Sequence, residues 1–162
     1  MPGDSTNDEA RVGAALDRAE LINLVFRFTQ AIDRRDFEAM ARCCAEPFEA
    51  KASGFGTVIL EVDGLDRFIE GLRRADDANP GGFAQHRYFD PGIELAGDDA
   101  EIWLSGEVYN ANGASAPEAG EVRVSGLQTR YGARREAAGW RLCSMRARYL
   151  WRRALPPSEV PG

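Results

Sequence analysis

The chain has 162 residues, a length typical of one domain that buries its own core. Its formal net charge of −6 argues against a nucleic-acid-binding surface, which is normally basic. The arginine pairs, such as Arg34–Arg35 and Arg134–Arg135, stand among acidic residues and are interpreted as solvated surface. No run of about 20 apolar residues is present to cross a membrane. The polar segment 1–10 lacks the apolar core of a signal peptide.

The cysteine and histidine content predicts reduced thiols and no metal site. Cys43, Cys44 and Cys143 form an odd set without a disulfide framework, which favours a cytoplasmic protein. His86 is the single histidine, so no zinc-like set of Cys and His ligands exists. The sequence also has no Gly-x-Ser-x-Gly elbow and no glycine-rich phosphate loop.

The first expected helix begins at Asp17, which has capping-box spacing to Glu20. Apolar residues then recur at helical spacing as far as Ile32. The polar residues 1–13 are expected to form a disordered tail. Asp36 is the expected N-cap of a second helix, which ends before Pro47.

A third helix and a series of strands follow in the chain. Residues 65–72 place apolar side chains at i, i+3, i+4 and i+7, as in an amphipathic helix. The expected strands cover residues 48–52, 57–62, 86–95, 100–110, 122–135 and 140–151, with a loop over 112–120. Along 100–110, Ile102, Leu104 and Val108 alternate with Trp103 and Tyr109 on the opposite face.

Helices followed by a long series of strands indicate an α+β domain over residues 14–153, with a tail at 154–162. We expect a cone-shaped barrel of a curved antiparallel sheet, with about three helices around an apolar pocket.

Two side chains are candidates for proton transfer. Asp33 falls within the apolar sector of the first helix on a helical wheel, so its carboxyl is expected to face the interior as a base. Alternatively, it could accept backbone amides at the start of the second helix. His86, at the start of a strand, belongs to the residue type best suited to proton transfer near neutral pH. A packed or surface role is its alternative.

Three segments resemble SnoaL-like proteins of the nuclear-transport-factor-like superfamily. Ala31-Ile32-Asp33-Arg34-Arg35-Asp36-Phe37 is similar to that family's opening helices. Gln85-His86, followed by Gly97-Asp98, resembles its strand that opens with histidine. Gly139-Trp140-Arg141-Leu142 resembles its final hairpin. The resemblance covers residues 14 to 151.

This resemblance implies an apolar pocket and an acid–base pair, without metal or organic cofactor. The family includes polyketide cyclases and enzymes similar to scytalone dehydratase, epoxide hydrolases and ketosteroid isomerase. At the matching positions of this sequence, the resemblance places the acid–base pair at Asp33 and His86. Phe28 and Gln30 stand where the dehydratase-like branch often has Tyr and His. Its second pocket histidine is absent, Tyr109 and Asn110 being the nearest polar residues, which favours a cyclase or isomerase.

The sequence therefore predicts an acid–base enzyme acting on an oxygenated apolar metabolite such as a polyketide or terpenoid. Cyclisation, isomerisation, dehydration and epoxide opening all need the same groups, with Asp33 as base and His86 as acid or hydrogen-bond donor. The residues expected to bind the substrate are Phe26, Phe28, Phe55, Tyr88, Tyr109, Asn110 and Tyr131.

The sequence also leaves a second function open and predicts a homodimer. A non-catalytic binding or subunit domain of the same fold is the alternative function. Asp33 and His86 pointing into one solvent-reachable cavity, within hydrogen-bond reach directly or through one water, would favour the enzyme. If both were bound to backbone groups, the binding domain would be favoured. We also expect a homodimer formed through the sheet, because Trp103 and Tyr109 would project from its outer face.

Overall fold

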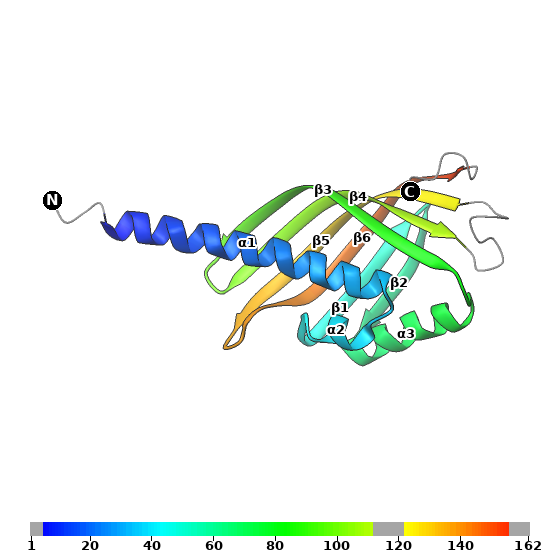
Figure 1. Cartoon of the computed structure of the whole chain (residues 1–162), viewed down its shortest axis with the longest axis horizontal. Coiled ribbons are helices and arrows are strands. Elements are labelled where there is room, and N and C mark those ends of the chain that lie inside the picture. Colours follow the sequence, from blue (N-terminus) through cyan, green and yellow to red (C-terminus); the bar gives the residue numbers. More distant parts are fainter. Residues whose placement is uncertain (1–4, 112–121, 156–162) are drawn as a thin grey trace.

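The computed structural model describes residues 5–111 and 122–155, which form three helices and one six-stranded sheet (Figure 1). The helices are α1 (Ser5–Asp33), α2 (Phe37–Ala41) and α3 (Leu65–Asp77). The strands are β1 (Cys44–Gly54), β2 (Thr57–Asp63), β3 (Phe83–Ala96), β4 (Asp99–Ala111), β5 (Val122–Glu136) and β6 (Gly139–Leu155). The loop expected at 112–120 lies outside the described residues, as do 1–4 and 156–162.

The sheet confirms the α+β class but is mixed rather than fully antiparallel. Its strand order is β2-β1-β6-β5-β4-β3, and β1 runs parallel to β6. The other neighbouring pairs are antiparallel. β2 and β3 occupy the two edges, so the curved sheet remains open rather than closing into a barrel. The return of the last strand beside the first creates the parallel pair, which local sequence patterns do not specify.

Helix α1 begins at Ser5, twelve residues before the predicted start at Asp17. Residues 5–13 are therefore helical, although we expected them in the tail; alanine-rich sequence near them favours helix. This part extends beyond the sheet (Figure 1), and Leu16 is 62% exposed. Within the two described ranges, no helix has the length and hydropathy needed to cross a membrane.

The Asp17 side chain contacts the last two strands instead of capping a helix. It accepts hydrogen bonds from Arg135 Nη2 at 2.5 Å and from Trp140 Nε1 at 3.1 Å. The Arg135 guanidinium also lies over the Trp140 ring, 4.3 Å from its centroid. The carboxylate thus joins the middle of α1 to the β5–β6 end of the sheet.

The inward face of α1 supplies much of the core. Leu21, Leu24, Val25 and Phe28 are at most 1% exposed. The Phe28 ring packs edge-on against Tyr131, with 5.8 Å between centroids, and it also contacts the aromatic rings of Phe48 and Phe68. This packing holds α1 across one face of the sheet (Figure 1).

The alternation predicted for β4 is confirmed. Ile102, Leu104 and Val108 are buried on the inner face, whereas Trp103 is 42% exposed on the outer face. Tyr109 lies on the outer face too, but it is only 9% exposed because it joins a second small apolar cluster. Of the two predicted outward aromatics, Trp103 is therefore the accessible one.

We expect Asp17→Asn to lower the free energy of unfolding at pH 7 by about 1 kcal/mol, because it weakens a charged hydrogen bond. The hydrogen bond from Arg135 holds the pKa of Asp17 below its ordinary value of 3.8. A lowered pKa stabilises the fold above the unfolded-state value, and this contribution disappears as the pH falls through the folded-state value.

Urea unfolding at pH 7 and in acid would measure this contribution. The difference between the native protein and Asp17→Asn should shrink below pH 3.8. Asp77→Asn, at the exposed end of α3, is the matched control. A destabilisation by Asp17→Asn that stays constant down to low pH would contradict the assignment.

Candidate active site

Asp33 and His86 are in direct contact. Asp33 is the last residue of α1, and His86 lies near the start of the edge strand β3. His86 Nδ1 is 2.6 Å from Asp33 Oδ1, and the backbone amide of His86 donates to Asp33 Oδ2 at 2.9 Å. Their side chains are 17% and 18% exposed. The structure thus brings together the two residues expected to transfer protons, and solvent reaches both.

Tyr88 and Tyr131 extend this pair with hydroxyl groups. The His86 and Tyr88 rings stack with 6.1 Å between centroids. The Tyr88 hydroxyl lies 3.1 Å from the Tyr131 hydroxyl and 3.3 Å from Thr129 Oγ1. Tyr88 lies opposite Gly106 on β4, where a β-carbon would collide with its ring. Gly106 therefore leaves the space that the tyrosine ring occupies.

Both phenols remain protonated over the physiological pH range. Burial raises the pKa of Tyr88 and raises the pKa of Tyr131 well above 10. Thr29 also hydrogen-bonds Tyr131, and its Oγ1 donates to the Val25 carbonyl at 2.8 Å. The interior beside His86 therefore holds a connected set of neutral hydroxyl groups.

Sequence reasoning missed the two threonines of this set. Thr29 is 4% exposed and lies on the buried face of α1, while Thr129 is 2% exposed on the inner face of β5. The inward position of Thr129 could have been recognised from strand periodicity, because Thr129 lies two residues from each of the inward-facing Leu127 and Tyr131. Polar residues at such positions require hydrogen-bond partners.

The phenylalanines expected to bind substrate lie elsewhere. Phe28 is fully buried in the core. Phe26 is 38% exposed on the outward side of α1, and Phe55 is 53% exposed at the β1–β2 turn. Phe26 stood at the margin of the predicted apolar sector, and the sheet covers only the opposite side of the helix.

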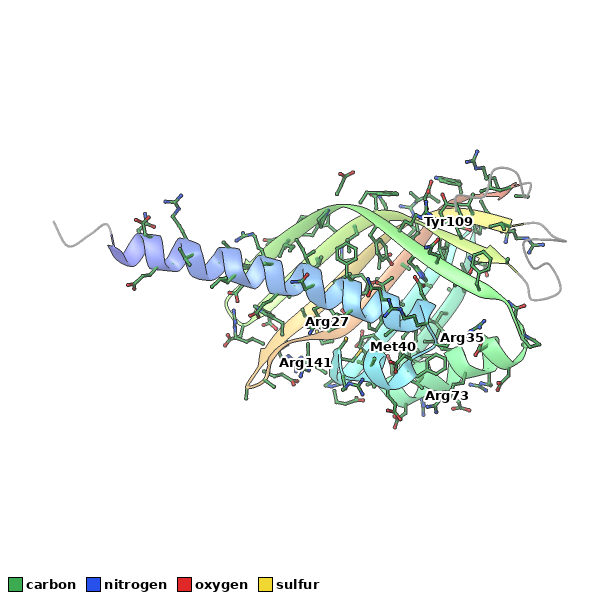
Figure 2. The ribbon with its side chains drawn as sticks, in the orientation of Figure 1. Arg27, Arg35, Met40, Arg73, Tyr109 and Arg141 are labelled. Atoms are coloured by element: carbon green, nitrogen blue, oxygen red, sulfur yellow. The ribbon has the colours of Figure 1, made fainter. Side chains whose placement is uncertain are left out.

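Tyr109 and Asn110 also have surroundings that differ from the expected pocket. The Tyr109 hydroxyl donates to Glu107 Oε2 at 2.7 Å, and the ring is covered by Arg87. Figure 2 shows Tyr109 far from Arg27, toward the other end of the sheet. Asn110 is exposed and pairs with Ala84, two residues before His86 on β3.

Within residues 5–111 and 122–155, no three His, Cys, Asp or Glu side chains are grouped to hold a metal ion. Asp33 and His86 are a pair without a third such ligand in these ranges. An imidazole in contact with a carboxylate can transfer protons and form hydrogen bonds.

Solved structures with similar folds were found by comparison. A nuclear-transport-factor-2-like protein with a cystatin-like fold from Novosphingobium aromaticivorans is 22% identical, with a TM-score of 0.70, over 93% of this chain and 92% of that one. A candidate dehydratase of the same superfamily from Streptomyces avermitilis is 15% identical, with a TM-score of 0.68, over 85% and 99%. The β subunit of benzoate 1,2-dioxygenase from Burkholderia mallei is 12% identical, with a TM-score of 0.68, over 82% and 89%.

The sequence comparisons define the family more directly. No curated protein matches the chain in sequence. The profile of the SnoaL-like domain matches residues 13–146, which include the elements from most of α1 through the start of β6. The structural neighbours show the corresponding nuclear-transport-factor-like fold. Together with the open, helix-covered sheet, this match establishes that the chain belongs to the family of SnoaL-like domains.

Proposed function

We propose that this protein is a cofactor-independent acid–base enzyme acting on an oxygenated apolar metabolite, such as a polyketide or terpenoid. The observation that carries the proposal is the 2.6 Å contact between His86 Nδ1 and Asp33 Oδ1, in a half-buried position beside neutral hydroxyls. A carboxylate that orients an imidazole is a recurrent arrangement for proton transfer. Such a pair can catalyse cyclisation, isomerisation, dehydration or epoxide opening.

The contacts favour His86 as the group that transfers the proton. Both oxygens of Asp33 are engaged, one by the imidazole and the other by the His86 amide. An Nδ1–H that donates to Asp33 leaves Nε2 with a free lone pair. We therefore propose the reverse of the roles expected from the sequence: His86 is the base, and Asp33 positions it and stabilises the imidazolium.

The proposed reaction returns the proton that it removes. His86 Nε2 takes a proton from a carbon next to a carbonyl, and the electron pair moves onto the carbonyl oxygen. A hydroxyl such as that of Tyr88 donates a hydrogen bond to this oxygen, whose charge it stabilises. The Nε2–H then protonates another carbon in isomerisation, or a leaving hydroxyl in dehydration, which departs as water.

A non-catalytic binding or subunit domain is the second candidate. The Asp33 bond to the His86 amide links α1 to β3, and such a link could serve the fold alone. One structural neighbour is the β subunit of a dioxygenase. This candidate predicts that ligands bind without turnover and that Asp33 substitutions change stability rather than rate.

We also propose a homodimer formed through the outer face of the sheet. Trp103 and Trp151 are 42% and 41% exposed there, and each ring covers a glycine on the adjacent strand. Ion pairs occur on strands of this sheet, as in Arg130–Glu101 at 2.9 Å and Lys51–Glu61 at 2.8 Å. A face with balanced charge can meet its own copy about a twofold axis without repulsion.

The free cysteine thiols are relevant to the cellular compartment in which the protein acts. The described cysteines Cys43, Cys44 and Cys143 are all reduced. Because unpaired thiols persist in reducing compartments, we propose that the protein acts in the cytoplasm.

Asp33→Asn and His86→Ala should each lower turnover at least 100-fold, since positioned proton transfer contributes 10²–10⁴-fold. The double variant should lose no more than the more damaged single variant, because residues that act as a unit are not additive. Conversion of a panel of apolar ketones, alcohols and epoxides, followed by mass spectrometry, would measure the rates. Asp77→Asn is the control, and near-native turnover in Asp33→Asn would contradict the proposed pair.

The neutral His86 ring should carry its proton on Nδ1, because Asp33 accepts a hydrogen bond at that atom. Nitrogen-15 NMR can read this tautomer without assignment, since the chain has a single histidine. Asp33→Ala should shift the population toward the Nε2–H form. Finding the Nε2–H form in the native protein would exclude His86 Nε2 as the base.

Sedimentation should show a species of twice the 17.8 kDa chain mass at micromolar concentration. Trp103→Glu should convert this species into a folded monomer, because the new charge would be buried in the interface. Leu16→Glu is the matched control, since Leu16 is more exposed but lies on the projecting part of α1. Dissociation by Leu16→Glu alone would place the interface on that helix instead.

A further inference from the structure

A groove follows the flank of α1 that faces the β5–β6 turn, away from the Asp33–His86 pair. One cavity of about 750 Å³ lies between α1 and the turn residues 138–141, and a second of about 420 Å³ lies between α1 and α2. Arg27, Gln30 and Arg141 line both cavities, so the two adjoin one another. Figure 2 shows Arg27 and Arg141 next to one another below α1.

Arginine dominates the charge of this groove. Its lining includes the four residues Arg27, Arg34, Arg42 and Arg141. The carboxylates of the lining are Glu20 and Asp36. Asp36 Oδ1 already accepts the backbone amide of Ala39 at 2.9 Å as the cap of α2. The groove is therefore locally positive in a chain whose net charge is −6.

Three of these arginines lie near one buried side chain. Cys43, which is 7% exposed, is among the residues that line the second cavity. Burial raises the pKa of its thiol, while the nearby charges of Arg27, Arg141 and Arg42 act in the opposite direction. Side chains from α1, the end of α2 and β6 thus bring positive charge to the same place.

Several surface arginines form ion pairs outside the groove. Arg35 pairs with Asp76, Arg130 with Glu101, and Arg135 with Asp17. Among the residues that the structure describes, Arg27, Arg34 and Arg42 have no carboxylate within ion-pair distance. The four arginines of the lining outnumber its two carboxylates, and like charges in excess repel one another. A bound anion would remove this repulsion.

We propose that this groove binds a small molecule bearing a diphosphate group. Guanidinium groups hold phosphate oxygens through paired N–H donors, and two adjacent phosphates match several converging arginines better than one carboxylate does. The Gln30 amide supplies a further donor. The volumes suit a small-molecule ligand, with its organic part along Asn23 and Phe26.

This site would be separate from the proposed acid–base site. Asp33 faces β3, where it contacts His86, whereas Arg27 faces β6, where it lines a groove with Arg141. A ligand on the arginines would therefore occupy the other flank of α1. Its binding can be measured without any knowledge of the enzyme's substrate.

Calorimetric titration of the full chain with inorganic pyrophosphate, ADP and citrate at low ionic strength would test the proposal. We expect saturable binding of pyrophosphate and ADP, with citrate at least tenfold weaker. Tighter binding of ADP than of pyrophosphate would identify a nucleotide-like ligand, and equal binding would identify free diphosphate. Citrate binding as tightly as pyrophosphate, or no saturable binding of pyrophosphate, would overturn the proposal.

The double variant Arg27→Gln/Arg141→Gln should weaken pyrophosphate binding at least tenfold without lowering the thermal unfolding midpoint. Arg67→Gln, on the exposed surface of α3, removes a charge outside the groove and should leave binding unchanged. Equal weakening by Arg67→Gln would indicate only general charge attraction. A large loss of stability in the double variant would assign these arginines a structural role. Either result would overturn the site.

The three tryptophan indole N–H signals locate the ligand independently. Trp140 lines the groove, while Trp103 and Trp151 lie on the outer face of the sheet. Pyrophosphate should shift the Trp140 signal and leave the other two unchanged in ¹⁵N-correlated NMR spectra. Shifts confined to Trp103 or Trp151 would place the anion on the sheet and contradict the proposal.

Discussion

Two carboxylates on α1 determine where this helix lies on the sheet. Asp17 binds Arg135 and Trp140 on β5 and β6, whereas Asp33 binds His86 on the edge strand β3. Sixteen residues of helix separate them, a length of about 24 Å. The apolar stripe of α1 between these two positions is buried against the core. Hydrophobic packing holds the helix on the sheet, and the two charged contacts set its direction.

This placement gives α1 two flanks with different chemistry. Toward β3, the half-buried Asp33 contacts the His86 imidazole, whose ring stacks on Tyr88. Toward β6, Arg27 and its neighbours line an open groove. Asp33 and Arg34 are consecutive, but α1 ends at Asp33, and Arg34 stands in the turn that follows, where it lines the groove. Proton transfer and anion binding could therefore proceed on one helix without sharing a cavity.

Local patterns predicted several elements well. The β1–β2 hairpin, the amphipathic α3 and the alternating faces of β4 agree with the structure. The start of α1 and the parallel β1–β6 pair were not predicted correctly. The parallel pair depends on contacts between distant segments, since β1 pairs with the last strand. The early start of α1 was missed because Asp17 was interpreted as a helix cap, whereas its carboxylate binds a residue 118 positions away. A capping-box pattern cannot reveal a distant arginine that competes for the carboxylate.

The α+β class, the family resemblance and the choice of Asp33 and His86 as candidates could be predicted from the sequence, because they follow from periodicity, motif order and side-chain chemistry. The contact between these two side chains, the separate hydrogen bond between the Tyr88 and Tyr131 hydroxyls, and the exposure of Phe26 depend on the tertiary structure. It also gathered arginines from separate elements into one groove. The physical reason is that periodicity specifies which side of an element is apolar, whereas the neighbour of each polar side chain depends on how distant elements pack.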